Sequence, residues 1–351
     1  MENSELKFIY WFAYYGLDSP SVRYRAEYPL KYFKEKYNVD YTLVIPGYSM
    51  MAICKFIIAY ISALVFPASK SLIVIQRVRS NFVYAKLLKL LVNLKKNNTV
   101  YDIDDSDYLE HKAETIYYFA KKCNAVSAGS KKIAEHLSQY NNKVIHTTSP
   151  IFDLGIIKKN KNDVFTVGWI GGFGWGHKNS LVLSAFPALK KLSFNFRLII
   201  IGVVSEVDFN FIKDYFKENS NIELEIPKNI EWKNEFSLQE KIVSFDIGIA
   251  TLLDTEIQIS KSGIKAKQYL NNGVPVLSTN LPENNSVIED GVNGYFCSTV
   301  DAFQEKITEF YKMDNEKYQW FSNNARQLSK RFGHDMYFLC FIKLKQLVSA
   351  K

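Results

Sequence analysis

The chain has 351 residues, and a chain of this length usually divides into more than one domain, each with its own hydrophobic core. Its residues are 47% hydrophobic and 15% aromatic, which is enough to fill two cores. The net charge of +8 comes from residues 1–160, which hold 22 Lys or Arg against 14 Asp or Glu. No nucleic-acid-binding motif accompanies this charge, so we expect an anionic membrane or a phosphate-bearing acceptor as partner and no nucleic acid, with a merely solvated basic surface as the alternative.

The beginning of the chain lacks the basic start and cleavage site of a signal peptide. Its longest apolar stretch, Met51 to Phe66, is interrupted by Lys55 and is shorter than the ~20 residues that a membrane-spanning helix needs. We expect a buried helix there, and a helix that presses apolar residues into a bilayer surface is the alternative. Four widely spaced cysteines argue against a disulfide framework and favour the cytoplasm.

Short runs of β-branched and aromatic residues alternate with helix-length amphipathic segments along the whole chain. This pattern predicts an α/β fold of two tandem, doubly wound Rossmann-like domains with parallel sheets. The predicted strands of the first half are Lys7–Tyr15, Val39–Ile45, Leu72–Gln76, Thr99–Ile103, Ala125–Ala128 and Val144–Thr148. Those of the second half are Phe165–Ile170, Arg197–Ile201, Ile222–Ile226, Asp246–Leu252 and Val274–Ser278.

A polar, charged segment from Asp153 to Asp163 is typical of a connection between domains. We therefore expect a first domain at 1–155, a linker at 156–163, a second domain at 164–332 and a final helix at 333–351 that packs back on the first domain. In open α/β sheets ligands bind beyond the carboxyl ends of the strands, so two such domains facing each other across a cleft can each hold one substrate.

A glycine-rich turn follows the predicted strand Phe165–Ile170 and leads into a helix near Asn179. Glycines let backbone N–H groups approach an anion, and a helix N-terminus supplies the positive end of a dipole. We expect Gly171, Gly172 and Phe173 to meet a diphosphate together with Lys178, and a plain flexible turn is the alternative. His177 adjoins this turn, but a hydrogen-bonding role at the helix start is favoured for it.

A second anion-binding pattern lies between Ile259 and Phe296. Its loop opens an amphipathic helix that stops at Gly273, before a buried strand. Backbone amides at the start of the helix would point at a phosphate, with one lysine a turn further on. The expected donor-binding residues here are Lys261, Ser262, Gly263, Ile264 and Lys265. The alternative, a solvated lysine-rich helix face, explains Lys265 and Lys267 but not the whole segment.

This segment resembles the signature of family 4 glycosyltransferases, also called group 1, in which a helix ending in Gly-x-Pro-Val precedes an Asp-Gly-x-Asn-Gly turn. Gly273 to Val276 and Asp290 to Gly294 match these two elements. The resemblance implies the two-domain GT-B architecture, with a nucleotide-diphosphate sugar bound by the second domain. In the family two glutamates hold the sugar and the ribose, and here those positions fall on Ser260 and Gln268. Gln268 can still hydrogen-bond ribose hydroxyls, whereas Ser260 puts the donor sugar in doubt.

The first half is similar to bacterial polysaccharide glycosyltransferases that carry a Ser-x-Arg-x-Arg element near the first helix. Arg23 and Arg25 would there bind an acceptor phosphate, and a salt-bridged helix start is the alternative.

The strand end Val100–Tyr108 resembles an Asp-Ile-Asp-Asp element of the same group. We expect Asp104 or Asp105 to hydrogen-bond the acceptor, or else to cap a helix. Asp102 and Asp104 mimic a metal-binding Asp-x-Asp, but the two-domain resemblance implies an enzyme that needs no metal.

The resemblance thus implies a hexosyltransferase-type glycosyltransferase, metal-independent and without a cofactor, that moves a sugar to a glycan or lipid-linked acceptor in surface polysaccharide synthesis (capsule or lipopolysaccharide). Transfer would proceed with retention, and inversion is left open. Lys178 and Lys265 would stabilise the leaving diphosphate. The expected location is the cytoplasm, with peripheral contact at the inner face of the plasma membrane. A nucleotide-sugar epimerase or hydrolase of the same fold and a non-catalytic GT-B partner protein are the alternatives.

Overall fold

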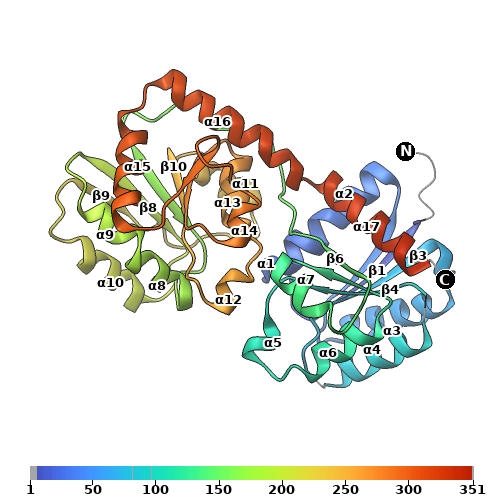
Figure 1. Cartoon of the computed structure of the whole chain (residues 1–351). Coiled ribbons are helices and arrows are strands. Elements are labelled where there is room, and N and C mark those ends of the chain that lie inside the picture. The colour runs from blue at the N-terminus through green and yellow to red at the C-terminus, as the bar shows by residue number, and fades with distance from the viewer. Residues whose placement is uncertain (1–5, 81, 96, 350–351) are drawn as a thin grey trace. The chain divides into compact units, whose positions relative to one another are not determined.

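The computed structural model describes residues 6–80, 82–95 and 97–349 and divides into two compact units (Figure 1). Unit 1 comprises Met1–Phe152, Ser260–Ser262 and Phe332–Lys351. Unit 2 comprises Asp153–Ile259 and Gly263–Arg331. Each unit is built around one parallel sheet with helices on both faces, so the predicted α/β class with two doubly wound domains is confirmed.

The sheet of unit 1 has the strand order β2-β1-β3-β4-β5-β6, and all its pairings are parallel. Its central strands are buried on both faces, which is why they appear in the sequence as continuous apolar runs. The six strands are β1 (Phe8–Ala13), β2 (Asp40–Val44), β3 (Ser71–Gln76), β4 (Thr99–Ile103), β5 (Ala125–Ala128) and β6 (Val144–His146). All six coincide with predicted strands, with ends that differ by at most two residues.

Helices cover both faces of this sheet. The face toward Tyr10 and Ile73 packs against α3, α4, α6 and α7, and the face toward Trp11 and Val74 packs against α2 and α17 (Figure 1). The helical elements are α1 (Pro20–Val22), the π-helical turn η1 (Arg23–Glu27), α2 (Tyr28–Tyr37), α3 (Met50–Val65), the 3₁₀ turn η2 (Ala68–Lys70), α4 (Val83–Leu94), α5 (Asp107–Glu110), α6 (Glu114–Lys122), α7 (Lys131–Leu137) and α17 (His334–Ser349).

Helix α3 differs from the expectation of a buried helix. Only Ala59 and Ala63 are buried, whereas Met51, Ile58 and Val65 are more than two-thirds exposed. The expectation is wrong because only one side of the helix packs on the sheet, through Ala59 and Ala63 and the partly buried Phe56, Tyr60 and Leu64, and its other apolar residues face outward. Within the described residues, no helix has the length and apolar character needed to pass through a bilayer.

The final helix α17 belongs to unit 1, where it lies beside α2. Phe341 stacks on Trp11 with ring centroids 5.7 Å apart, and Phe338 lies 3.8 Å from the ring of Tyr37. Burial of each large aromatic side chain of this kind contributes about 1.5–3 kcal/mol. The chain therefore closes the core of unit 1 with residues that lie more than 300 positions after its first strand.

The sheet of unit 2 has the order β12-β11-β10-β7-β8-β9 and is also parallel throughout. Its strands are β7 (Thr166–Ile170), β8 (Phe196–Ile201), β9 (Ile222–Glu225), β10 (Ile247–Ala250), β11 (Val276–Ser278) and β12 (Gly294–Phe296). Five of these were predicted. The sixth, β12, was missed because it is only three residues long and follows directly on a turn.

One face of this sheet packs on α9, α10 and α15 in a core that includes Phe186, Ile212 and Phe303. The helical elements of unit 2 are α8 (Trp175–Leu183), α9 (Ala185–Lys190), α10 (Glu206–Phe216), α11 (Glu235–Ile242), α12 (Glu256–Ile259), α13 (Ile264–Asn271), α14 (Pro282–Asn285), α15 (Val300–Lys312) and α16 (Asn315–Ser329). A 3₁₀ turn, η3 (Lys330–Phe332), leads from α16 toward α17.

Candidate functional site

The order of the second sheet reverses at β7, which lies between β8 and β10. In doubly wound sheets such a switch point opens a crevice at the carboxyl ends of the strands, and ligands bind there. The loop that leaves β7 is the glycine-rich turn starting at Gly171. The fold therefore places this turn where a ligand of unit 2 is expected.

Two hydrogen bonds tie the glycine turn to the end of β8. The N–H of Gly171 donates to Ile201 O at 3.0 Å, and the N–H of Phe173 donates to Gly202 O at 3.1 Å. A β-carbon at Gly202, whose φ is +106°, would collide with the carbonyl oxygen of Gly171. The close approach of the two loops thus depends on glycine.

Helix α13 begins next to this turn, and Tyr269 anchors it to the sheet. The Tyr269 hydroxyl accepts a hydrogen bond from the N–H of Ile170 at 2.9 Å and donates to Ile249 O at 3.2 Å. Gly263 caps the helix in the left-handed region, at φ +64°. Since the first N–H groups of any helix have no acceptor within it, the start of α13 presents donors for an anion.

Lys265 lies in the first turn of α13 and reaches over the glycine turn. A β-carbon at Gly171 would come within 2.5 Å of its Cε atom. Its ammonium donates to Nε2 of His177 at 3.0 Å, and it lies 5.7 Å from the ring centroid of Trp169. The sequence favoured a plain helix-start role for His177, and the structure adds this contact with Lys265. A cation, an imidazole and the start of a helix thus meet at the carboxyl end of β7.

The structure orients Lys178 differently. Its ammonium pairs with Asp208 on α10 at 2.8 Å and lies 4.0 Å above the ring of Phe211. Hydrogen bonds from Lys178 and Ser205 lower the pKa of the Asp208 carboxyl. The two lysines that the sequence predicted as a pair therefore have different partners, Lys265 at the glycine turn and Lys178 on α10.

The other expected donor residues lie along the same segment. Phe173 is buried, whereas the backbone of Gly172 leaves open space around it. Gln268 is partly exposed on α13, and Ser260, which stands at the position of the family's sugar-binding glutamate, is buried. Ser262 and Ile264 are partly exposed on either side of Gly263.

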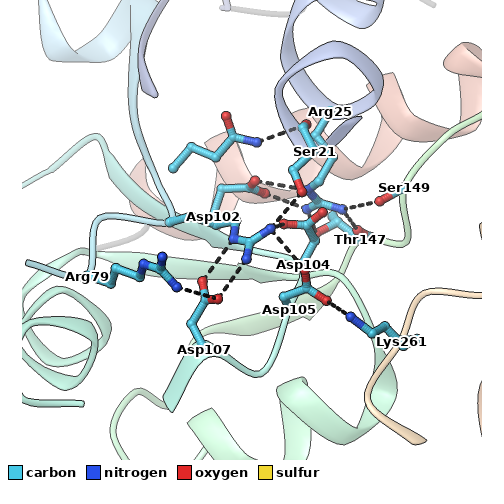
Figure 2. A network of polar contacts seen from close by, with 12 residues as sticks. Ser21, Arg25, Arg79, Asp102, Asp104, Asp105, Asp107, Thr147, Ser149 and Lys261 are labelled. Carbon is cyan, nitrogen blue, oxygen red and sulfur yellow. Dashed lines mark hydrogen bonds and ion pairs between the residues drawn. The ribbon is translucent and has the colours of Figure 1, made fainter. Parts of the chain in front are cut away.

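Unit 1 contains an ion-pair network centred on Arg77, directly after β3 (Figure 2). The Arg77 guanidinium makes two hydrogen bonds to Asp107, of 2.9 and 2.7 Å, and lies 3.0 Å from Asp105 and 3.6 Å from Asp104. Its side chain is only 9% exposed. Its backbone φ is +53°, a value that residues other than glycine rarely adopt. A buried cation held in this strained backbone organises three carboxylates.

The pKa values of the two candidate acceptor carboxylates are shifted in opposite directions. Burial raises the pKa of Asp104, against the opposing charges of Arg77 and Arg25. Burial alone would also raise the pKa of Asp105, but Arg77 and Lys261 outweigh it, so that this pKa is lowered. Lys261 lies in the short segment 260–262 of unit 1 and donates to Asp105 at 2.9 Å (Figure 2). Asp105 is thus the partly exposed member of the pair and the one whose pKa is lowered.

Arg25 lies in the interior of unit 1. Its guanidinium is fully buried, with hydrogen bonds of 2.9 and 2.5 Å to Asp102 and one of 2.6 Å to Thr147 O. Arg23 is also buried, and it donates to the carbonyl oxygens of Leu17 and Asp18. Arg25 thus forms the salt-bridged helix start that the sequence left open as the alternative.

Among the described residues, one group of side chains has the spacing of a metal site, since the ligand atoms of Asp107, Glu110 and His111 lie within 4.8 Å of one another. Both carboxylate oxygens of Asp107 already accept hydrogen bonds from Arg77. Asp102 and Asp104, the predicted mimic of a metal motif, lie instead against Arg25 and Arg77.

Sequence reasoning missed the central residue of the network. The only sequence signal for Arg77 was its place in an Arg-Val-Arg segment directly after a buried strand. The second arginine of this segment, Arg79, lies 3.5 Å from Asp107. The carboxylates that Arg77 binds come from the end of another strand, β4, so the pairing depends on the sheet order and could not be read from neighbouring residues.

Comparison with known proteins gives a family match over the second half of the chain. Residues 156–328 match the family described as glycosyl transferases group 1. Among curated proteins, no sequence matches this chain.

Solved structures share the fold at low sequence identity. The pneumococcal O-GlcNAc transferase GtfA, in complex with UDP and GlcNAc, has a TM-score of 0.59 at 14% identity over 85% of this chain, and this chain spans only 60% of its length. Sucrose-phosphate synthase from Thermosynechococcus elongatus has a TM-score of 0.69 at 10% identity over 98% of this chain and 100% of that one. HepE of Anabaena, in complex with UDP and glucose, has a TM-score of 0.61 at 14% identity over 96% and 98%. These similarities confirm the GT-B fold.

Proposed function

Because residues 156–328 belong to the group 1 glycosyl transferases, we propose that this protein transfers a sugar from a nucleotide-diphosphate sugar to a glycan or lipid-linked acceptor. The observation that carries the proposal is the position of Lys265, in the first turn of α13 and against Gly171 at the switch point of the sheet. A cation beside the backbone amides at the start of a helix is suited to a diphosphate.

The proposed donor is a uridine diphosphate sugar, since GtfA and HepE are described in complex with UDP. The amides of residues 262–264 and the Lys265 ammonium would receive the diphosphate as the bond to the sugar breaks. Fixed positive groups lower a barrier most where negative charge develops, which here is the leaving group. Lys178 would add a second cation after release from Asp208, and Gln268 would hydrogen-bond the ribose.

On the acceptor side we assign the direct contact to Asp105. Its carboxylate is partly exposed, and its lowered pKa keeps it ionised and able to accept a hydrogen bond from a sugar hydroxyl. Asp104 and Arg25 would act by holding the loop in place, because both are buried. We propose that transfer proceeds with retention and without a metal ion, on an acceptor of surface polysaccharide synthesis at the cytoplasmic face of the plasma membrane.

A direct test incubates the protein with UDP-glucose, UDP-GlcNAc and other UDP-sugars and a lipid-linked acceptor fraction, with and without EDTA. We expect transfer that EDTA leaves unchanged and that Lys265→Ala slows by about 10²–10³. The anomeric configuration of the product, read by nuclear magnetic resonance, tests retention.

One observation favours a second candidate. Ser260 and Gln268 stand where the family has glutamates, so a non-catalytic protein that only binds nucleotides is the alternative. Nucleotide binding without any transfer would support that candidate. Free sugar released at the same rate with and without acceptor would instead point to a hydrolase.

A further inference from the structure

Two neighbouring helices of unit 1, α3 and α4, turn a continuous set of apolar side chains outward. They are in contact, since the Tyr60 hydroxyl donates to Leu87 O at 3.1 Å and the rings of Phe56 and Tyr84 lie 5.2 Å apart. The exposed apolar residues are Met50, Met51, Ile53, Ile57, Ile58, Ile61 and Val65 on α3 and Val83, Leu87, Leu90 and Leu94 on α4, with Phe82 just before α4. We name this set the α3/α4 face.

The spacing of these residues makes the face a surface and not a scatter of exposed side chains. Positions three, four and seven apart on a helix share one side, and Ile57, Ile61 and Val65 follow this spacing with Ile58 alongside. Soluble monomers rarely expose a contiguous apolar patch of this kind, so we expect something to cover it.

The segment that forms the face carries charge of a single sign, although Glu114 on the neighbouring α6 lies near Lys89. Between Asp40 and Asp102 the sequence contains eight Lys or Arg residues and no Asp or Glu. Three of these cations lie on the helices themselves, Lys55 on α3 and Lys86 and Lys89 on α4. This segment therefore supplies as much positive charge as the net charge of the whole chain, which is +8.

From these observations we infer that the α3/α4 face docks on an anionic lipid bilayer, with its apolar side chains among the acyl chains and its lysines among the headgroups. A helix lying in the plane of a membrane interface has this pattern of one apolar side bordered by lysines. Helix α3, at 16 residues, is shorter than the ~20 residues needed to cross a bilayer, so it would lie on the surface.

Two exposed aromatic residues beside the α3/α4 face are also suited to contact with a bilayer. Tyr48 is fully exposed just before α3, and Phe82 is 72% exposed just before α4. Both follow parallel strands, β2 and β3, and so lie toward the carboxyl edge of the first sheet. Tyrosine favours the headgroup level of a bilayer, and phenylalanine favours its apolar boundary. The membrane would then adjoin the edge of unit 1 at which ligands bind in such sheets.

A second copy of the chain fits the face less well. In a two-fold contact each surface meets its own copy, so the lysines of one face would approach those of the other. The segment between Asp40 and Asp102 offers no carboxylate to pair with them. An anionic bilayer satisfies both the apolar residues and the lysines.

The test is co-sedimentation of the full chain with vesicles of phosphatidylcholine alone and of phosphatidylcholine mixed equally with phosphatidylglycerol. The wild type is expected to bind the anionic vesicles more tightly than the neutral ones, and less tightly as salt is added. The double variant Ile58→Glu/Ile61→Glu should reduce binding at least tenfold. Lys55→Gln/Lys86→Gln should reduce binding to anionic vesicles only, by roughly 25-fold, since each lysine near such a surface is worth about a fivefold change.

Leu183→Glu is the matched control, because Leu183 is an exposed apolar residue of unit 2, on α8. It should bind like the wild type, and all variants should keep the wild-type melting temperature. Equal vesicle binding by wild type and Ile58→Glu/Ile61→Glu would overturn the inference, as would a wild type that binds neither kind of vesicle. A lipid-free dimer, detected by sedimentation velocity and lost in the same double variant, would assign the face to a second copy instead. None of these readouts depends on the proposed transferase activity.

Discussion

The Cε atom of Lys265 fills the space that a β-carbon at Gly171 would need, 2.5 Å from where that carbon would lie. Gly171 also has φ of +157°, a backbone conformation that residues with side chains rarely adopt. The side chain of Lys265 thus occupies its observed position only while residue 171 lacks a side chain. This contact makes the position of the lysine depend on a residue in another loop.

Gly171→Ala is therefore expected to displace Lys265 and weaken UDP binding by roughly 10- to 100-fold, the loss of one charge-assisted hydrogen bond. The lysine can move, so the protein should stay folded, with a cost of about 1–3 kcal/mol from the backbone alone. Gly16→Ala is the control, because Gly16 lies in unit 1 and a β-carbon there would meet only the Ile45 side chain, at 4.0 Å. Isothermal titration calorimetry compares the two, and equal affinities would contradict the proposed role of the contact.

Replacing Lys265 tests the leaving-group role. Lys265→Ala is expected to lower kcat by about 10²–10³, the usual effect of removing one group that stabilises developing charge. Lys178→Ala should have a smaller effect, because that lysine is already paired with Asp208. Steady-state kinetics on the purified variants decide between them. A greater loss in Lys178→Ala would mean that Lys178 leaves Asp208 to serve as the main diphosphate ligand.

Loss of Arg77 should destabilise unit 1. Arg77→Met leaves the carboxylates of Asp104 and Asp107 buried without their cation, which typically costs about 3–5 kcal/mol. The control is Arg197→Met, which breaks the exposed pair with Glu223 and should cost at most about 1 kcal/mol. Urea denaturation gives the free energy of unfolding for both variants. Similar losses would show that the network contributes no more than a surface ion pair.

The attachment of α17 to α2 should depend on pH. Burial alone would raise the pKa of Asp335, but hydrogen bonds from Lys36, Tyr32 and Tyr37 outweigh it and lower the pKa to about 2 from the usual 3.8. The Asp335 carboxylate thus contributes stability that is complete above the usual pKa and is lost as pH falls toward 2. Because the pair is about half exposed, we expect less than about 1 kcal/mol.

Asp335→Asn is therefore expected to lose less stability than the wild type between pH 4 and pH 2. Thermal unfolding followed by circular dichroism across this range measures the difference. Lys36→Met should remove part of the effect, because the hydroxyls of Tyr32 and Tyr37 remain. An identical acid dependence in Asp335→Asn and wild type would refute the assignment.

The alternation of buried strands and helices made the fold predictable from sequence. Runs such as Leu72–Gln76 are apolar because both faces of the strand are covered, and few other structures produce that pattern. Helix α3 was misjudged for a related reason. Its residues are apolar on nearly all sides, so the sequence does not reveal that the side with Ala59 and Ala63 packs on the sheet and that the opposite side faces water.

The site was predictable at the level of loops, less so at the level of side chains. His177 and Lys178 are neighbours in sequence, but successive residues on a helix point about 100° apart. His177 consequently meets Lys265, whereas Lys178 meets Asp208 on α10. Such contacts between distant segments depend on how helices pack, which local sequence patterns do not record.

Binding of UDP to the purified wild type and to Lys265→Ala, measured by isothermal titration calorimetry, tests the central claim most directly. We predict one UDP site per chain in the wild type and an affinity at least tenfold weaker in the variant. Absence of binding by the wild type to UDP or any other nucleoside diphosphate, or equal binding by the two proteins, would contradict it.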